Sequence, residues 1–334
     1  MTARGSFNHI TGSAAVFGAR QIPSEEIDRA FGMPAGKLRE RAGIDSVAYV
    51  SEGEAEIHLA ARAARNALKN GDCPAPSIDW LIATSETHRG YPSLAAQLHK
   101  SLGLRETCGA MDVGGACLGL LNGLQVAETF LRSGAASNVL VITSDAHSRA
   151  LSPKRVPGEF GGLFGDGASA FVLGRETAER ESSYRVGGFF FGCSSQYAEA
   201  IRVNEGAGGA IELVFEGEAL SRAAIAKLIS LVEETESRSG ISRMAVNAFA
   251  THQPNPRLVA LLAKQLGVPL ERFPAIARTR GNLGSSTCGA ALHEALASKN
   301  ISGARPANEA IFLASLGPGL LMGAGWLIRE GSRA

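Results

Sequence analysis

The sequence predicts a mostly parallel, layered α/β protein made of two copies of one supersecondary pattern. The first observation is an internal match without gaps: residues 92–104, PSLAAQLHKSLGL, and residues 256–268, PRLVALLAKQLGV, are identical at seven of thirteen positions. The second observation is that short apolar runs alternate with stretches of helical period. An offset of 164 residues, about half of 334, indicates a duplication with a pseudo-twofold axis, and the alternation indicates stacked layers of helices and sheet.

The elements of the first copy follow from its apolar runs and their boundaries. The run IDWLIATS is short and lies between turn-forming residues, which is typical of a strand buried on both faces. Pro92 starts a helix in which leucines recur every four residues until Gly103 ends it. The predicted order is an opening strand, the helix 55–71, the strand 78–85, the helix 92–103, the helix 117–134, and the strands 138–145 and 168–174.

The second copy repeats this order along the C-terminal part of the chain. Residues 184–240 supply its opening strand and helix. The chain therefore divides into an N-terminal half, 1–175, and a C-terminal half, 176–334. The remaining predicted elements are the strand 243–252, the helix from Pro256, the helix 287–300, and the strands 310–317 and 323–330.

Composition and charge exclude several classes of protein. Lys and Arg number 33 against 32 Asp and Glu, so neither a nucleic-acid nor a membrane partner is indicated. The N-terminal segment has no apolar core of signal-peptide length, and no uninterrupted apolar stretch approaches the roughly 18 residues of a membrane span, so we expect a cytoplasmic protein. The five cysteines lie far apart without a CxxC pair, which predicts neither a metal site nor disulfides.

Three residues at the ends of the repeated elements are candidates for catalysis. His252 closes a predicted buried strand, and the 164-residue offset aligns it with His88. The same offset brings Cys117 onto Gly281, next to Asn282. If the two copies pack about a pseudo-twofold axis, these residues converge on one cleft from distant parts of the chain.

The residue types suit acyl transfer through a thiol. A helix N-terminus and a neighbouring imidazole favour the thiolate of Cys117, which can attack a thioester. The backbone N–H groups of Cys117 and of the glycine-rich segment around Gly317 can bind the resulting oxyanion. His252 and Asn282 are neutral hydrogen-bond donors, which suit an enolate oxygen formed after loss of carbon dioxide. Alternatively, Cys117 is a buried structural thiol, and Asn282 is a helix cap.

Residues 80–334 resemble the β-ketoacyl-acyl carrier protein synthase III family of the thiolase superfamily. Five motifs carry the resemblance, in the family's order and near its spacing. They are DVGGACLGLLNGLQ around Cys117, FGDGA at 164–168, HQPN at 252–255, GNLGSS at 281–286 and LGPGL at 316–320.

The resemblance implies a five-layered αβαβα thiolase fold of two duplicated halves, and a homodimer. It implies that Cys117 is acylated by a primer thioester and that malonyl carrier protein then decarboxylates and condenses to a 3-oxoacyl product. His252 and Asn282 would promote decarboxylation and stabilise the enolate. Gly317 or a neighbouring residue would contribute to the oxyanion hole. No permanently bound cofactor is implied. The primer would arrive as acyl-coenzyme A or on acyl carrier protein, in fatty-acid, cofactor-precursor or specialised-metabolite biosynthesis.

The resemblance also assigns substrate-binding and carrier-binding residues. Arg257, close to Asn255 of HQPN, matches the family arginine that contacts the carrier protein or the cofactor phosphates. Arg41 in RERAGI matches a second positive charge that reaches the phosphates. Tyr91 stands where the family has a phenylalanine that reaches across the dimer. Arg149 is a candidate to hold a dicarboxylic primer.

One departure from the family and two alternative functions qualify these expectations. The family's adenine-stacking tryptophan near position 37 is absent, so the primer is expected on a carrier protein, or coenzyme A is held differently. In one alternative, Cys117 passes its acyl group to an alcohol or amine without decarboxylation. In the other, the chain is a non-catalytic partner subunit.

Overall fold

Nine strands form one hydrogen-bonded sheet that passes through both halves of the chain, in the order β11-β12-β13-β8-β1-β7-β6-β4-β5. The structure is a computed structural model and describes residues 8–156, 158–175, 184–205, 211–298 and 308–330. The strands of this sheet are β1 (Asn8–Phe17), β4 (Trp80–Thr84), β5 (Gly109–Asp112), β6 (Asn138–Ala146), β7 (Asp166–Arg175), β8 (Tyr184–Cys193), β11 (Ala248–Thr251), β12 (Asn308–Gly317) and β13 (Leu321–Glu330).

Reading outward from the centre, both halves of the sheet have the same pairing. In the first series, β1, β7, β6, β4, the first two pairs of neighbouring strands are antiparallel and the third pair is parallel. The second series, β8, β13, β12, β11, has the same pattern. The two series meet at β1 and β8, where only two residue pairs are in register. This symmetry confirms the predicted duplication.

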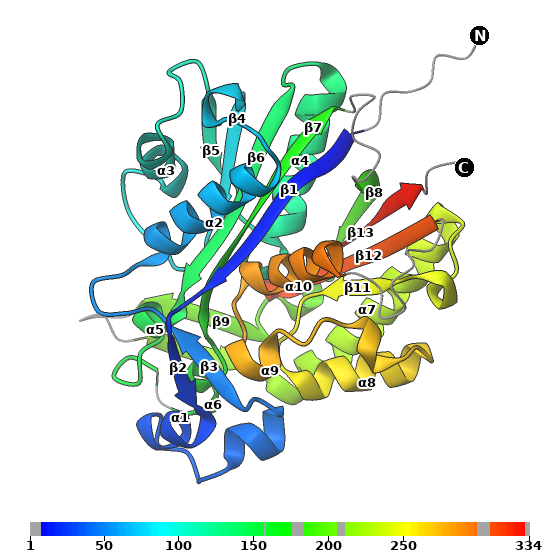
Figure 1. Cartoon of the computed structure of the whole chain (residues 1–334). Coiled ribbons are helices and arrows are strands. Elements are labelled where there is room, and N and C mark those ends of the chain that lie inside the picture. The colour runs from blue at the N-terminus through cyan, green and yellow to red at the C-terminus, as the bar shows by residue number, and fades with distance from the viewer. Residues whose placement is uncertain (1–7, 157, 176–183, 206–210, 299–307, 331–334) are drawn as a thin grey trace.

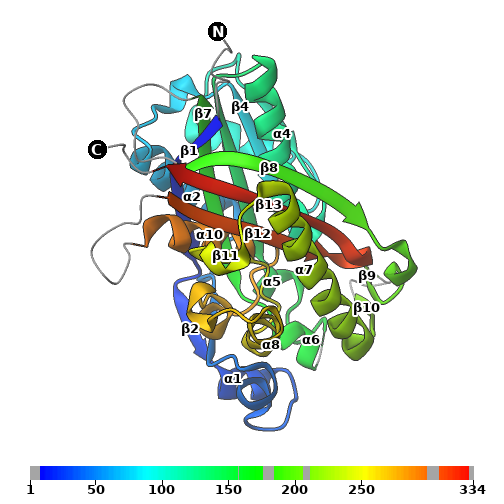
Figure 2. The same ribbon diagram turned by 90° about the vertical axis from the view of Figure 1, so that its right-hand side faces the viewer.

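Helices cover and separate the two halves of the sheet in five layers (Figures 1 and 2). One outer layer holds α2 and α3, which contact strands of the first series, and the other holds α7 and α8, with α7 against β12 and β13. Between the two series lie α4 and α10, whose apolar residues form one cluster with both. The bounds are α2 (Glu56–Asn70), α3 (Leu94–Leu102), α4 (Gly119–Ser133), α7 (Gly217–Ser239), α8 (Pro256–Leu266) and α10 (Ser285–Ala297). The αβαβα prediction is confirmed.

A smaller region of short elements lies below the large sheet, toward the bottom of Figure 1. Its apolar side chains form a cluster of their own, which includes Phe160, Leu163 and Phe164. The elements are α1 (Ser24–Ala30), α5 (His147–Ala150), α6 (Glu159–Gly162), α9 (Ala277–Arg280), and two antiparallel two-stranded sheets, β2 (Arg20–Pro23) with β3 (Ser46–Tyr49) and β9 (Ile201–Glu205) with β10 (Ile211–Phe215).

Two details of the sequence prediction are corrected. The sheet is mixed rather than mostly parallel, because β7 and β13 return antiparallel beside β6 and β12. The 164-residue offset holds for the helices but not for the strand ends. β4 ends at Thr84, four residues before His88, whereas β11 ends immediately before His252. His88 is therefore not the structural counterpart of His252.

The predicted boundary between halves, 175/176, borders residues 176–183, which lie outside the described residues, so this division stays a prediction. Across the described ranges, no helix is both long enough and apolar enough to cross a lipid bilayer.

Candidate active site

Cys117 lies in a tight turn that leads directly into α4. The turn is a single 3-10 turn, Ala116–Leu118, preceded by Gly115 at a φ of +127°, a backbone conformation that glycine adopts readily. The carbonyl oxygen of Cys117 accepts a hydrogen bond from Ser315 Oγ at 2.7 Å, so strand β12 holds the turn from the other half. Cys117 is 9% exposed. The thiol is thus fixed at the N-terminal end of a fifteen-residue helix.

His252 is the first residue after β11, and its backbone N–H continues the sheet ladder by donating to Ala314 O at 2.9 Å. Gln253, 2% exposed, ties the following turn down by donating to Pro274 O at 2.6 Å. Asn255 caps helix α8 by accepting from the Leu258 N–H at 3.0 Å. The HQPN motif therefore positions His252 through the hydrogen bonds of Gln253 and Asn255, which follow it in the chain.

Asn282 precedes α10 and is held by both its backbone and its side chain. Its N–H donates to Leu163 O, and its own carbonyl accepts from the Gly165 N–H, each at 2.9 Å. Its side-chain Oδ1 accepts from the Gly284 N–H at 3.0 Å and from Thr287 Oγ1 at 3.2 Å. With the oxygen occupied, the carboxamide nitrogen is left to donate into the space beside Cys117.

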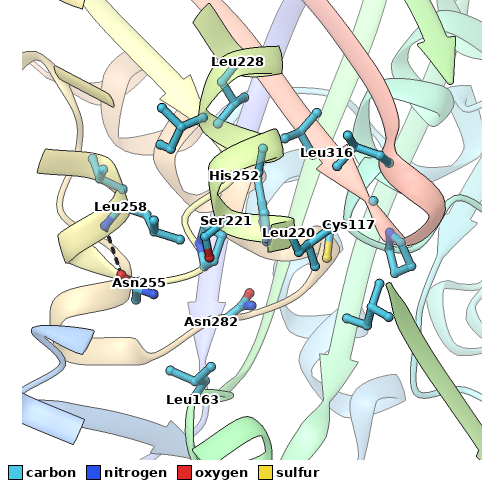
Figure 3. Close-up of a pocket in the computed structure, with 18 of the residues that line it drawn as sticks. Cys117, Leu163, Leu220, Ser221, Leu228, His252, Asn255, Leu258, Asn282 and Leu316 are labelled. Atoms are coloured by element: carbon cyan, nitrogen blue, oxygen red, sulfur yellow. Dashed lines mark hydrogen bonds between the residues drawn. The ribbon is translucent and has the colours of Figure 1, made fainter. Parts of the chain in front are cut away.

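Cys117, His252 and Asn282 line one cavity of about 160 Å³, and their side chains lie around the same space in Figure 3. They come from three separate elements: the turn before α4, the end of β11 and the turn before α10. The rest of the wall is mainly aliphatic and aromatic and comes largely from the region of short elements and from helices α7 and α8. Among the described residues that line the cavity, none is Asp, Glu, Lys, Arg or a second His. The cavity suits an apolar chain or a neutral linear arm.

Gly317 also lines this cavity and packs against the cysteine turn. A Cβ atom at Gly317 would lie 2.7 Å from the carbonyl oxygen of Gly115, a backbone atom that has little room to move. Only glycine lets the end of β12 approach the Cys117 turn this closely. The backbone of Gly317 therefore lies against the turn that carries Cys117.

The cavity environment keeps the imidazole neutral and makes the thiol difficult to ionise. Burial lowers the pKa of His252 to about 4, and Nδ1 is buried without a hydrogen-bond partner among the described residues. Burial also raises the pKa of Cys117 well above the usual value for a thiol, and the negative charge of Glu86 raises it further. The helix terminus alone does not make Cys117 a thiolate in the resting protein.

The predicted binding residues lie at the rim of the cavity or away from it. Asn255 lines the cavity, and Arg257, one residue into α8, is exposed and donates to Glu40 O at 3.1 Å. Arg41 is exposed on the π-helical turn Leu38–Ala42, which contacts α8. Tyr91 is fully exposed on the loop before α3. Arg149 is exposed, donates to Ser51 O at 2.8 Å and is not among the lining residues.

Sequence reasoning missed a group of ionisable side chains beside Cys117. Glu86, Asp145 and His147 bring one potential ligand atom each to within 4.8 Å of the others. Asp145 already accepts four hydrogen bonds, from Ser85 Oγ, Ser285 Oγ and the N–H groups of Glu86 and Thr87. We therefore interpret the group as an ion-pair cluster and assign no metal to it.

A signal for this cluster was present in the sequence. Glu86 follows the strand at 78–85, and His147 follows the strand at 138–145. These strands, β4 and β6, are parallel neighbours, so residues that follow them meet at one edge of the sheet. The adjacency of the strands, which the sequence alone did not provide, was needed to connect the two residues.

Comparison with known proteins gives consistent matches over both halves. Residues 111–194 match the family model of 3-oxoacyl-[acyl-carrier-protein] synthase III, and residues 237–328 match the model of its C-terminal part. The β-ketoacyl-[acyl-carrier-protein] synthase III of Cereibacter sphaeroides is 30% identical over 278 residues, covering 82% of this chain and 85% of that protein. The corresponding synthase of Alkalilimnicola ehrlichii is 29% identical, covering 87% and 91%.

Solved structures share the fold over nearly the whole chain. The 3-oxoacyl-[acyl-carrier-protein] synthase III of Aquifex aeolicus superposes with a TM-score of 0.84 at 24% identity, covering 96% of this chain and 99% of that one. A variant of OleA from Xanthomonas campestris, solved with lauric acid and lauroyl-CoA, superposes with a TM-score of 0.83 at 21% identity, covering 97% of this chain and 99% of that one.

Proposed function

Because the chain belongs to the 3-oxoacyl-[acyl-carrier-protein] synthase III family, we propose that Cys117 takes an acyl group from a primer thioester and passes it to malonyl carrier protein with loss of carbon dioxide. Membership of the family makes the protein an acyltransferase-type enzyme. The observation that supports the detailed proposal is the meeting of a thiol, a neutral imidazole and a carboxamide in one apolar cavity.

In the first half-reaction, Cys117 Sγ attacks the thioester carbonyl carbon, and the bond to the primer's sulfur breaks. The backbone N–H groups of Cys117 and Gly317 are proposed to hold the oxyanion, because Gly317 allows β12 to approach the cysteine turn. The product is a Cys117 thioester and a free primer thiol.

In the second half-reaction, the malonyl group loses carbon dioxide and becomes an enolate of the carrier thioester. His252 and Asn282 donate hydrogen bonds to the enolate oxygen. A neutral imidazole suits this task, because it donates a hydrogen bond without quenching the enolate by full proton transfer. The enolate carbon then attacks the acyl carbonyl and expels Cys117 as a thiolate, leaving a 3-oxoacyl carrier protein. The thiolate takes up one proton from solvent and returns to the resting thiol.

The cavity favours a neutral acyl chain as primer. The described part of its wall offers no cationic side chain for a second carboxylate, and Arg149 is not among the lining residues. For the carrier, the exposed guanidinium groups of Arg41 and Arg257 come from elements in contact with each other, which supports a shared phosphate or carrier-protein contact. We further propose a cytoplasmic homodimer in which Tyr91 reaches the partner.

Intact mass spectrometry tests the proposal. The protein is incubated with acetyl-, octanoyl-, lauroyl- and succinyl-coenzyme A and with acyl carrier protein thioesters, followed by malonyl carrier protein. We expect an adduct on Cys117 that disappears with carbon dioxide release and formation of 3-oxoacyl product, and no adduct in Cys117→Ala. An adduct that forms but never condenses, and instead moves to an alcohol or amine, would support the alternative acyl transfer. No adduct from any thioester would support the non-catalytic subunit.

A further inference from the structure

Part of the active-site cavity lies between helices α7 and α8, which contact each other. One face of α7 lines this part with side chains one helical turn apart, Leu220, Ala224 and Leu228. The facing side of α8 contributes Leu258 and Leu262, which are also one turn apart. The two helices are therefore the two walls of one channel, which we call the α7–α8 cleft.

Burial increases along both helices, which gives the cleft a mouth and a closed end. Leu220 and Leu258 lie in the first turns of α7 and α8 and are half-buried. Two turns further along α7, Leu228 is 5% exposed, and one turn further along α8, Leu262 is 1% exposed. Ser221 supplies a polar side chain at the mouth, and the lining side chains deeper along α7 are aliphatic. The cleft therefore suits a ligand whose apolar tail lies at the closed end.

The closed end reaches into the apolar core that α7, α8 and β12 share. Leu228, Leu262 and Leu320 line the cavity, are buried and belong to one core cluster. Protein cores are close-packed because an unfilled void forfeits dispersion contacts. An apolar cavity excludes water and binds apolar ligands. We therefore expect an apolar ligand to fill this space.

Strand β12 connects the cleft to the reactive centre. Leu316 lines the cavity and precedes Gly317, which lies against the turn that carries Cys117. In Figure 3, Leu228 and Leu163 lie at opposite ends of the site, with the thiol between them. A chain bound to Cys117 Sγ can therefore extend toward Leu228 and leave the side of Leu163 open.

The length of the cleft limits the size of such a chain. Leu220 and Leu228 are eight positions apart on α7, which corresponds to about 12 Å along the helix axis. An extended chain advances about 1.2 Å per single bond, one third of the length of an extended residue, so about ten bonds span this distance. A longer chain would meet Leu228 and Leu262, whereas an acetyl group would leave most of the cleft empty.

We propose that the α7–α8 cleft is the acyl-chain subsite, that it binds the straight alkyl tail of a primer of about eight to ten carbons, and that Leu228 and Leu262 limit the length of this tail. The primer's carbonyl carbon stays at Cys117 while the tail lies between the helices. Each buried methylene raises the affinity about 4-fold, so a medium-length chain is favoured over acetyl. The inference rests on the proposed function, in which Cys117 is acylated.

Blocking the cleft tests this proposal. Ala224→Phe places an aromatic ring between the mouth and Leu228, and Ala226→Phe, on the exposed side of the same helix, is the matched control. Acylation of Cys117 by octanoyl- and by acetyl-coenzyme A is followed by single-turnover mass spectrometry. We expect Ala224→Phe to lower the ratio of the octanoyl rate to the acetyl rate by ~10-fold or more, and Ala226→Phe to leave it unchanged. An unchanged ratio in Ala224→Phe would overturn the proposal, and an equal fall of both rates would indicate that the cleft holds the arm common to both thioesters.

Enlarging the closed end gives an independent test, which also serves if Ala224→Phe does not fold. Leu228→Ala opens the end of the cleft, and Leu231→Ala is its matched control. The two leucines are equally buried in the same core cluster, and of the two only Leu228 lines the cavity. We expect Leu228→Ala to raise the ratio of the tetradecanoyl rate to the octanoyl rate by ~10-fold, and Leu231→Ala to leave it unchanged. The same chain-length profile in both variants would contradict the proposal.

A failure of the proposed function is distinguishable from a failure of this inference. If no thioester acylates the wild-type protein, the proposed function fails, and binding of decanoic acid is measured by isothermal titration calorimetry. Binding that is ~10-fold weaker in Ala224→Phe than in the wild type and in Ala226→Phe would still support the subsite. No binding to the wild type, or equal binding to the two phenylalanine variants, would overturn it.

Discussion

The loops after β4 and β11 leave equivalent strands of the two halves, yet they differ in length and chemistry. After β11 the chain takes four residues, 252–255, to reach α8, whereas after β4 it takes nine, 85–93, to reach α3. The short loop presents His252, a neutral imidazole, to the cavity. The long loop carries Glu86, a carboxylate whose Oε2 lies 3.7 Å from His147 Nε2 and which is not among the residues that line the cavity.

This difference shows how a duplicated scaffold can serve two half-reactions with different needs. In the proposed function, acylation must remove a proton from Cys117, and condensation needs donors that stabilise an enolate without protonating it. The sheet and helices have the same pairing order in both halves, so the divergence lies in what each strand-end loop presents. Variants of the two loops and of Gly317 can show whether the two tasks are separable.

Replacing His252 by alanine should give the largest separation. We expect condensation by the pre-acylated enzyme to fall by ~10²-fold or more, because a preorganised donor to the enolate is lost. Acylation of Cys117 should change much less, because the proposed oxyanion donors of that step, the backbone N–H groups of Cys117 and Gly317, remain. The measurement is 3-oxoacyl product formed from isolated acyl-enzyme and malonyl carrier protein. His88→Ala, which alters the sequence counterpart of His252 outside the cavity, is the control, and an equal loss of acylation in His252→Ala would contradict the division of tasks.

The fold was predictable because apolar periodicity and boundary residues are local signals. Helices α3, α8, α4 and α10 all appear where the repeat predicts them. Cys117 and Asn282 were found for the same reason, since each precedes one of the repeated helices. The antiparallel return of β7 was missed because strand direction depends on which neighbours pair.

The Glu86–His147 pair shows where local signals end. Neither residue belongs to a spaced motif, and 61 positions separate them in the chain, from 86 to 147. Their contact depends on β4 and β6 lying side by side, and the charge of Glu86 depends on that contact. Sequence spacing carries neither piece of information. His252 and Asn282 could therefore be proposed beside Cys117 from the sequence, whereas the cluster of Glu86, Asp145 and His147 could not.

Gly317→Ala should have a moderate effect on both half-reactions, because the oxyanion position is common to them. The added Cβ would lie 2.7 Å from the Gly115 carbonyl oxygen, so β12 or the cysteine turn must shift. We expect acylation and condensation each to fall about 10-fold, with a loss of about 1–3 kcal/mol in the free energy of unfolding. Gly114→Ala is the matched control, since a Cβ there has nothing within 4 Å. An effect on only one half-reaction would show that Gly317 serves that half alone.

The smallest expected effect is that of pH, between about 5.5 and 8, on the rates of acylation and condensation. Measuring both rates compares the loop after β4 with the loop after β11. Because the pKa of His252 is lowered to about 4, the imidazole is neutral throughout this range, and condensation by the acyl-enzyme should vary less than about 2-fold and decline only as the pH falls toward 4. Glu86, whose pKa is also lowered, stays ionised in the same range beside Asp145, His147 and Cys117. If it accepts the thiol proton, acylation is equally flat. If Cys117 must ionise unaided, its raised pKa makes acylation climb about 10-fold per pH unit. Rapid-quench rates of the two half-reactions from pH 5.5 to 8 therefore decide whether the loop after β4 takes part in the chemistry or only surrounds it.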